Sequence, residues 1–304
     1  MHESKIGTSN LQLRGDLIML VVTLFWGASY LFIKIGLTDM GAYNLIALRF
    51  GIAFLLASLV FYKRMRKTTW LVLKHSALLG IILFAALAVV TIGVQSTSAS
   101  NAGFLFSLAV VFVPLLVALI YKKRLQRHVL IGVFLSFVGI CLMTMTHGFG
   151  IHMGDLLIIL GALLYAIYIL VTDRVASKVD ALVLGIWQLG YTAVFATVFS
   201  FLFETPQLPQ TTSSWLAILA LGILCSACGF IGQTIAQQYT TPIRTGLIFS
   251  LEPVFTVLFS LLFLHEVLST QAYVGASFML FGVVISKLDF RQFHLMKRLD
   301  LVKK

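Results

Sequence analysis

The sequence predicts an all-α polytopic membrane protein of ten transmembrane helices, built as two five-helix repeats of inverted topology. Three observations lead to this fold class: the composition, the length of the apolar runs, and an internal repeat. Of the 304 residues, 60% are hydrophobic and 11% are charged, whereas about 25% of the residues in an average soluble domain are charged. This composition excludes a soluble globular protein.

Apolar runs long enough to cross a bilayer recur along the whole chain. A helix rises about 1.5 Å per residue, so about 20 residues span a hydrocarbon core of about 30 Å. The first run, residues 17–37, is longer than a signal-peptide core of about 7–15 residues, and we expect it to remain in the protein. The expected helices lie at residues 16–37, 42–62, 71–94, 99–121, 127–146, 154–172, 181–203, 215–239, 244–264 and 271–287.

Lysine and arginine gather in alternate connections between these runs, and the other five connections contain neither residue. Because positively charged flanks resist translocation, the basic connections and both termini are expected on the cytoplasmic side of a bacterial inner membrane. The net charge of +11 is therefore attributed to membrane orientation, and no nucleic-acid partner is expected. The basic positions are Lys5, Arg14, Lys63, Arg64, Arg66, Lys67, Lys74, Lys122, Lys123, Arg124, Arg127, Arg174, Lys178 and Arg244, with more in the tail.

The chain also repeats itself. Residues 106–140 align with residues 249–283 without a gap, and Gln95 aligns with Gln238 in the same register. Each repeat holds an odd number of expected helices, so the second enters the membrane in the opposite direction, as in many transport proteins. The predicted segments are an N-terminal cytoplasmic segment 1–15, a first repeat 16–146, a second repeat 154–287 and a basic cytoplasmic tail 288–304.

Several short motifs follow one another in a fixed order. They are Phe25-Trp26-Gly27 with Lys34, Arg49-Phe50, Ser107-Leu108 with Pro114, Gln237-Gln238-Tyr239-Thr240-Thr241-Pro242, Ser250-Leu251-Glu252-Pro253-Val254-Phe255, and His265-Glu266 with Gly275. In this order the chain resembles the drug/metabolite transporter superfamily, specifically its EamA-like ten-helix members. The resemblance implies a carrier, commonly an exporter, of amino acids or other small metabolites. It departs at Lys122-Lys123-Arg124, where the family commonly has Gly-Glu.

Polar and amphipathic side chains at membrane depth are the candidate site residues. Such groups are unfavourable in hydrocarbon and usually face a bundle interior or a water-filled path. The aromatic residues either form the wall of a substrate cavity or pack in the core. The glutamines either bind a polar substrate or hydrogen-bond between helices. The candidate substrate-binding residues are Trp26, Tyr30, Arg49, Gln95, Tyr165, Tyr168, Gln188, Tyr191, Gln233, Gln237 and Glu252.

Arg49 and Glu252 are the charged members of this set. Arg49 is expected to attract a substrate carboxylate or guard the outer gate; alternatively, it extends to the outer interface. Glu252 is expected to attract a cationic group or exchange a proton; alternatively, it bonds groups that Pro253 frees in its helix. Their depths differ by roughly 8 Å, which a bound zwitterion spans more easily than a direct ion pair.

The expected function is secondary transport of small metabolites such as amino acids, with export as the expected direction and alternating access between the halves. A membrane-embedded sensor or scaffold and an intramembrane enzyme are the alternatives. We expect no enzyme activity, catalytic residue, cofactor or metal site: Cys225 and Cys228 have the spacing of a redox motif, but they lie within an expected helix and lack the acidic or histidine neighbours that would complete a metal site. The expected partners are a small-molecule substrate, the lipid bilayer and a proton as candidate coupling ion, with monomer and homodimer both open.

Overall fold

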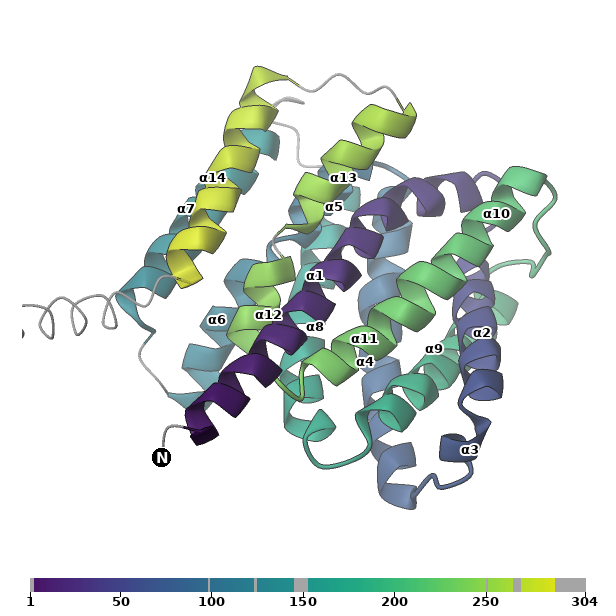
Figure 1. Cartoon of the computed structure of the whole chain (residues 1–304). Helices are drawn as coiled ribbons and strands as arrows, with labels where there is room; N and C mark the ends of the chain where they lie inside the picture. The colour runs from purple at the N-terminus through teal and green to yellow at the C-terminus, as the bar shows by residue number, and fades with distance from the viewer. Residues whose placement is uncertain are drawn as a thin grey trace, which may run out of the picture.

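The computed structural model describes residues 3–97, 99–122, 125–144, 153–249, 251–264 and 269–287, and within these ranges every regular element is helical (Figure 1). The first half contains α1 (Glu3–Gly36), α2 (Ala42–Val60), α3 (Tyr62–Met65), α4 (Trp70–Val94), α5 (Ala99–Phe106), α6 (Ala109–Tyr121) and α7 (Arg127–Thr144). The second half contains α8 (Met153–Ala176), α9 (Ala181–Phe203), α10 (Thr212–Ala220), the π-helix η2 (Leu221–Cys228), α11 (Gly229–Ala236), α12 (Pro242–Phe249), α13 (Glu252–Phe259), the π-helix η3 (Ser260–Leu264) and α14 (Thr270–Lys287). Outside the described residues lie Lys123, Arg124, Ser250, His265, Glu266 and the tail 288–304.

Eight stretches of the described chain are long and apolar enough to cross a membrane. They are Leu11–Gly36, Ala42–Val60, Trp70–Val94, Ala102–Ile120, Met153–Ala176, Ala181–Phe203, Thr212–Ala236 and Pro242–Phe263. The predicted all-α polytopic class is therefore confirmed. The fifth and tenth expected helices correspond to α7 and α14, whose described parts do not meet the same length and apolarity. The count of ten spans stays a prediction.

The two repeats pack the same way at opposite ends of the bundle. A Cβ added to Gly15 of α1 would lie 3.1 Å from the carbonyl oxygen of Ala236, at the end of α11. A Cβ added to the equivalent Gly154 of α8 would lie 2.8 Å from the carbonyl oxygen of Gly93, at the end of α4. The helix α11 ends beside Gly15 of α1, whereas α4 ends at the other end of the bundle (Figure 1). The repeats are therefore related by an inversion of direction.

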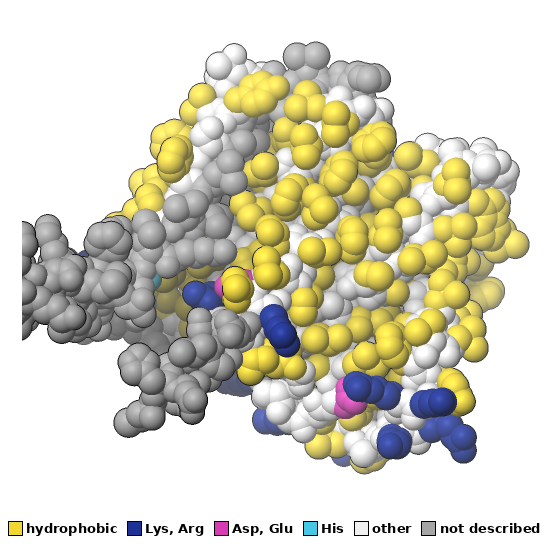
Figure 2. All heavy atoms as spheres, in the orientation of Figure 1, with side chains coloured by type: hydrophobic (Ala, Val, Ile, Leu, Met, Phe, Trp, Pro, Cys, Tyr) yellow, Lys and Arg dark blue, Asp and Glu magenta, His cyan; other side chains and the backbone are white. Residues whose placement is uncertain are grey.

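The two ends of the bundle differ in charge. Hydrophobic side chains cover much of the surface, and lysine and arginine gather towards one end (Figure 2). We call this the basic end; it carries Arg64, Lys67, Lys178 and Arg244. The opposite end carries the carboxylates of Asp39, between α1 and α2, and Glu204, after α9.

The helices α7 and α14 form a pair at one side of the bundle (Figure 1). A Cβ added to Gly282 of α14 would lie 2.6 Å from the carbonyl oxygen of Gly132 and 2.7 Å from Ser136 Oγ in α7. The spacing of Gly132 and Ser136 predicts a close helix approach because small residues let backbones come together. The structure confirms that approach.

The fourth and ninth expected helices are each broken; Pro253 indicated the interruption in the ninth, whereas nothing in the sequence indicated a break at Ser107. The first break lies at Ser107 and Leu108, where Ser107 Oγ donates to the Gly103 carbonyl over 2.7 Å and the next amides bond three residues back. The second break precedes Pro253, which has no N–H to continue the helix. Pro114, which also belongs to the fourth expected helix, lies inside α6.

Candidate functional site

The two helix breaks meet in the middle of the bundle. Phe106 is the last residue of α5 and Phe249 is the last residue of α12, and the two are equivalent in the repeat. Their ring centroids are 5.7 Å apart, and both rings contact Tyr165 of α8, with centroid distances of 5.2 and 5.3 Å. Breaks at corresponding positions of inverted repeats typically mark a binding site near the midplane.

A cavity of about 30 Å³ lies at these breaks. Its lining residues, all buried, are Trp26, Ser29, Tyr30, Ile33, Arg49, Leu87, Val90, Phe106, Tyr165, Phe230, Phe249 and Glu252. Three pairs among them are equivalent in the repeat. The register that aligns Gly15 with Gly154 pairs Trp26 with Tyr165. The register that aligns Gln95 with Gln238 pairs Leu87 with Phe230 and Phe106 with Phe249. The cavity therefore lies on the approximate two-fold axis between the halves.

Trp26 is at the centre of the aromatic wall. Its ring centroid lies 6.0 Å from that of Tyr165, 5.1 Å from that of Phe230 and 5.5 Å from that of Phe249. The indole Nε1 donates to the carbonyl oxygen of Cys225 over 2.9 Å. Cys225 belongs to the π-helix η2, whose wider turn alters the backbone bonding and often marks a functional position. The second repeat thus fixes the indole that the first repeat contributes.

Arg49 and Glu252 reach the cavity from different repeats, and each is 2% exposed. Arg49 Nε donates to Ser226 Oγ over 2.9 Å, and its guanidinium carbon lies 5.0 Å from the Phe50 ring centroid. Glu252 lies in the first turn of α13, where the helix dipole favours a carboxylate. Tyr30 hydrogen-bonds the Glu252 carboxyl, whereas Glu252 Oε2 has no partner among the described residues.

Arg49 and Glu252 do not form an ion pair with each other, since the two ion pairs in the described part of the chain join other residues. Arg49 is buried and held by Ser226, so its side chain does not extend to the bundle surface. A buried polar atom without a partner is unfavourable unless a ligand or water satisfies it. The cavity therefore presents a cationic group and a partly unsatisfied carboxyl group to its occupant.

A layer of amides and hydroxyls lies beside the aromatic wall. The Tyr165 hydroxyl donates to Gln233 Oε1, the Tyr168 hydroxyl donates to Gln188 Oε1, and each bond measures 2.9 Å. Gln188 Nε2 in turn donates to Thr234 Oγ1 over 2.9 Å. All five side chains are at most 1% exposed. The hydroxyls fix which way the two amides point, so each amide presents a defined donor or acceptor.

This amide layer continues towards the basic end along α11. Gln237 lies one turn beyond Gln233, nearer the end of α11, and its Nε2 donates to the Ile169 carbonyl over 3.0 Å. Gln233 Nε2 and Gln237 Oε1 are buried and have no partner among the described residues. Between the cavity and the basic end there are thus one unpaired donor, Gln233 Nε2, and one unpaired acceptor, Gln237 Oε1, among the described residues.

Comparison with known proteins identifies the family. The model of the EamA-like transporter family matches the chain twice, at residues 13–145 and 152–288. The chain belongs to the EamA-like transporter family. An uncharacterized transporter of Archaeoglobus fulgidus is 31% identical to this EamA-like transporter over 277 residues, covering 91% of this chain and 87% of that protein. The uncharacterized transporter YyaM of Bacillus subtilis is 25% identical over 284 residues, covering 88% and 92%.

The fold of this EamA-like transporter is also found among solved structures. One crystal structure superposes with a TM-score of 0.75 and covers 92% of this chain and 98% of its own. At 21% sequence identity, the likeness establishes the fold alone. The resemblance noted from the sequence motifs is confirmed by the family match.

Nine of the eleven predicted site residues of this EamA-like transporter lie in the buried cavity or its amide layer, and two lie elsewhere. Gln95 is exposed after the end of α4. Tyr191 is half-buried and packs against Trp187, with ring centroids 6.3 Å apart. The nine residues that come together are Trp26, Tyr30, Arg49, Tyr165, Tyr168, Gln188, Gln233, Gln237 and Glu252.

Several cavity residues were missed because they are ordinary apolar residues in sequence. Phe230 contacts Trp26 and also Phe50, with ring centroids 5.5 Å apart. Phe106 and Phe249 were aligned as a repeat pair, but neither was predicted to line a site. Their equivalence in the repeat could have predicted this contact, because two equivalent residues near the two-fold axis lie next to each other.

Two carboxylates close the opposite end of this EamA-like transporter, and we call their contacts the carboxylate latch. Glu204 accepts hydrogen bonds from the backbone amides of Tyr43 and Asn44, over 3.0 and 2.8 Å, at the start of α2. Asp39 accepts from the backbone amide and hydroxyl of Thr211, both over 3.1 Å, at the start of α10. Glu204 of the second repeat thus caps α2 of the first, and Asp39 of the first repeat holds Thr211, the N-cap residue of α10 in the second.

At the basic end the repeats are joined by Asp16 of α1. Its carboxylate accepts from Thr240 Oγ1 over 2.9 Å and pairs with Arg244 Nη1 at 3.1 Å. The cavity is therefore enclosed between contacts at both ends of the bundle.

Proposed function

We propose that this chain is a secondary transporter of small amphipathic metabolites, amino acids or related compounds, and that it works by alternating access between its inverted halves. The observation that carries the proposal is the meeting of the two helix breaks at a buried cavity, with a carboxyl oxygen of Glu252 left without a partner among the described residues. Such a site is reached from each side in turn when the repeats rock against each other.

The lining groups fit a substrate with an apolar body and opposite charges at its head. The aromatic wall takes the apolar body, Arg49 takes a carboxylate and Glu252 takes an ammonium group. A cavity of about 30 Å³ holds roughly one water molecule and not a metabolite. The conformation described is therefore a closed one in this proposal, and binding requires the halves to separate.

Glu252 is also the candidate coupling group. A buried carboxyl group exchanges a proton readily when its surroundings change between two conformations. Tyr30 contacts the Glu252 carboxyl group, and Oε2 has no partner among the described residues. The carboxyl group can therefore bind either a cation or a proton. The competing role is structural, in which the carboxyl group only supports the start of α13.

Orientation and direction belong to the same proposal. The basic end faces the cytoplasm because Lys and Arg resist translocation, so both termini are cytoplasmic. A bacterial inner membrane is the membrane we propose. Export is the proposed direction, with the driving gradient deciding it. The transporter assignment goes with the expectation that the chain has no enzyme activity.

Counterflow in liposomes tests the proposal. Purified protein is reconstituted, loaded with unlabelled compounds, and assayed for uptake of labelled amino acids, amines and nucleosides. Uptake that requires a loaded substrate supports secondary transport. The Gln233→Ala variant is expected to lose most of it, while Gln126→Ala, an exposed amide before α7, keeps it. Absence of flux for the whole panel by folded protein counts against the proposal.

A further inference from the structure

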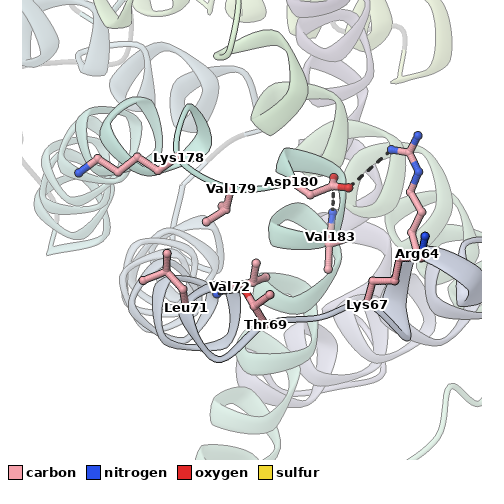
Figure 3. Close-up of a pocket in the computed structure, with 9 residues that line it drawn as sticks. All are labelled: Arg64, Lys67, Thr69, Leu71, Val72, Lys178, Val179, Asp180 and Val183. Atoms are coloured by element: carbon pink, nitrogen blue, oxygen red, sulfur yellow. Dashed lines mark hydrogen bonds and ion pairs between the residues drawn. The ribbon is translucent and has the colours of Figure 1, made fainter.

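A second cavity, of about 420 Å³, lies at the basic end between the α3–α4 and α8–α9 connections (Figure 3). It shares no lining residue with the central cavity. Arg64 and Lys67 line it from the first repeat, and Lys178 and Asp180 line it from the second. In Figure 3, Arg64 and Lys67 lie on one side of the pocket and Lys178 lies on the other. The pocket therefore has cationic residues on both flanks, and the Lys178 side chain extends outward in this view.

The carboxylate in this pocket is already engaged. Asp180 Oδ1 caps α9 by accepting from the amides of Leu182 and Val183, over 3.0 and 3.3 Å. Its Oδ2 lies 3.7 Å from Arg64 Nη1. Within the described residues, Lys67 and Lys178 form no ion pair. Three cations and one carboxylate leave the pocket with a net positive charge.

The pocket lies at the level of a membrane surface. Trp70, the first residue of α4, is 70% exposed, and Lys74 Nζ lies 5.7 Å from its ring centroid. Exposed tryptophan next to lysine at a helix end is typical of the interface where lipid headgroups lie. Leu71, half-exposed in the same turn, gives the pocket an apolar wall. Phosphate groups are therefore the anions closest to these cations in a bilayer.

We propose that this pocket binds the phosphate group of an anionic phospholipid, or of a soluble phosphate ester with the same chemistry. The anion bridges Lys67 of the first repeat and Lys178 of the second, whose side chain turns inward when the anion binds. Because the pocket wall comes from both repeats, the anion stabilises the conformation in which the basic end is closed. The proposal does not depend on which substrate, if any, the central cavity binds.

Thermal unfolding of the purified full chain in detergent tests the proposal. Short-chain phosphatidylglycerol is titrated against phosphatidylcholine, and glycerol 3-phosphate is titrated separately at constant ionic strength. Phosphatidylglycerol is expected to raise Tm saturably while phosphatidylcholine does not. A cation near an anionic surface contributes roughly fivefold in affinity, so the Lys67→Ala/Lys178→Ala variant should require about 30-fold more lipid for half the effect.

The matched control is Lys63→Ala/Arg66→Ala, which removes two exposed charges from the same segment outside the pocket. It should stay within about twofold of the unmodified protein because those charges lie outside the pocket. Asp180→Asn keeps an N-cap for α9 and removes the counter-charge, so it should bind about fivefold more tightly. If alanine variants fold poorly, Lys67→Gln/Lys178→Gln replaces them.

A saturable Tm rise with glycerol 3-phosphate that Lys67→Ala/Lys178→Ala abolishes supports a soluble ester, and a rise with the lipid alone supports the headgroup. Equal weakening by the pocket and control variants would mean diffuse surface charge and overturns the proposal. Unchanged binding by the pocket variant also overturns it.

Discussion

The indole of Trp26 occupies the space that Gly229 leaves free: a Cβ at residue 229 would lie 2.6 Å from the indole Nε1. That nitrogen holds its hydrogen bond to Cys225 only while the ring stays in place. Gly229, where η2 meets α11, has no side chain, and this leaves the space that the Trp26 indole occupies.

Gly229→Ala is expected to displace the indole, break the bond to Cys225 and lower the free energy of unfolding by about 1–3 kcal/mol through overpacking. Transport should fall with it. Gly51→Ala in α2 is the matched control, since no atom lies within 4 Å of a Cβ built there. Thermal unfolding and counterflow measure both effects. Equal behaviour of the two variants would contradict the packing account.

Arg49→Gln is expected to weaken binding of substrates that carry a carboxylate. Hydrogen bonds to charged groups contribute about 1.5–3 kcal/mol, so the KM should rise about 10- to 100-fold for such substrates. The corresponding amines, which lack the carboxylate, should be little affected. Arg66→Gln, at an exposed position, is the control. An equal loss for amines and amino acids would assign Arg49 a structural role.

Glu252→Gln keeps the shape of the side chain and removes its proton exchange. If Glu252 couples transport to protons, uptake by the variant should no longer respond to a pH gradient, while counterflow without a gradient persists. Vesicle uptake at several imposed gradients measures this. Proton dependence equal to that of the unmodified protein would rule out the proton role and leave cation binding and structural support.

The carboxylate latch should have to open during transport. Asp39→Cys with Thr211→Cys places two thiols where the latch joins the repeats. A short thiol-reactive crosslinker is expected to stop transport, and reductant should restore it. The single variant Asp39→Cys, treated in the same way, is the control. Full activity of the crosslinked protein would show that this end stays closed throughout the cycle.

The latch should also have a defined pH range. The pKa of Asp39 lies below its ordinary value of 3.8, chiefly because the Ser214 side chain donates to the carboxylate, with further hydrogen bonds from Thr211 and Gln210. A depressed pKa stabilises the fold above the ordinary pKa, and this is lost as pH falls through the folded value. Asp39→Asn should therefore lower Tm at pH 7, with the difference narrowing below about pH 4. A constant difference would contradict this.

The fold class followed from sequence because bilayer thickness and backbone hydrogen bonding leave few choices for long apolar runs. Of the two helix breaks, Pro253 indicated the one in the ninth expected helix, but the one in the fourth did not follow from sequence. Ser107 and Leu108 stand inside an uninterrupted apolar run, and Ser107 ends α5 through local hydrogen bonds that hydropathy does not register. Pro114 gave a stronger sequence signal yet lies within α6, where neighbouring groups can satisfy the freed backbone.

The candidate site was predictable to the extent that polar groups avoid lipid. Gln188 and Gln233 lie on buried faces with hydroxyl partners. Gln95 has the same side chain and a repeat equivalent, but it lies past the end of α4 and is exposed. The expected helix 71–94 already ended before Gln95, so its amide side chain and its repeat equivalent, not its depth, made it a candidate. Phe230 carried no such signal at all.

The inverted repeat has a consequence for the energetics of switching. Exchanging the roles of the two copies converts one open state into the other, so much of the packing contributes equally to both and cancels in their difference. The two charged cavity residues are not duplicated: Arg49 aligns with Gln188, and Glu252 aligns with Ala109. The unequal side chains are left to set the equilibrium constant between inward and outward states. Changing the charge of Arg49 or Glu252 should therefore shift the ratio of inward-open to outward-open protein more than removing a larger apolar contact that both repeats share.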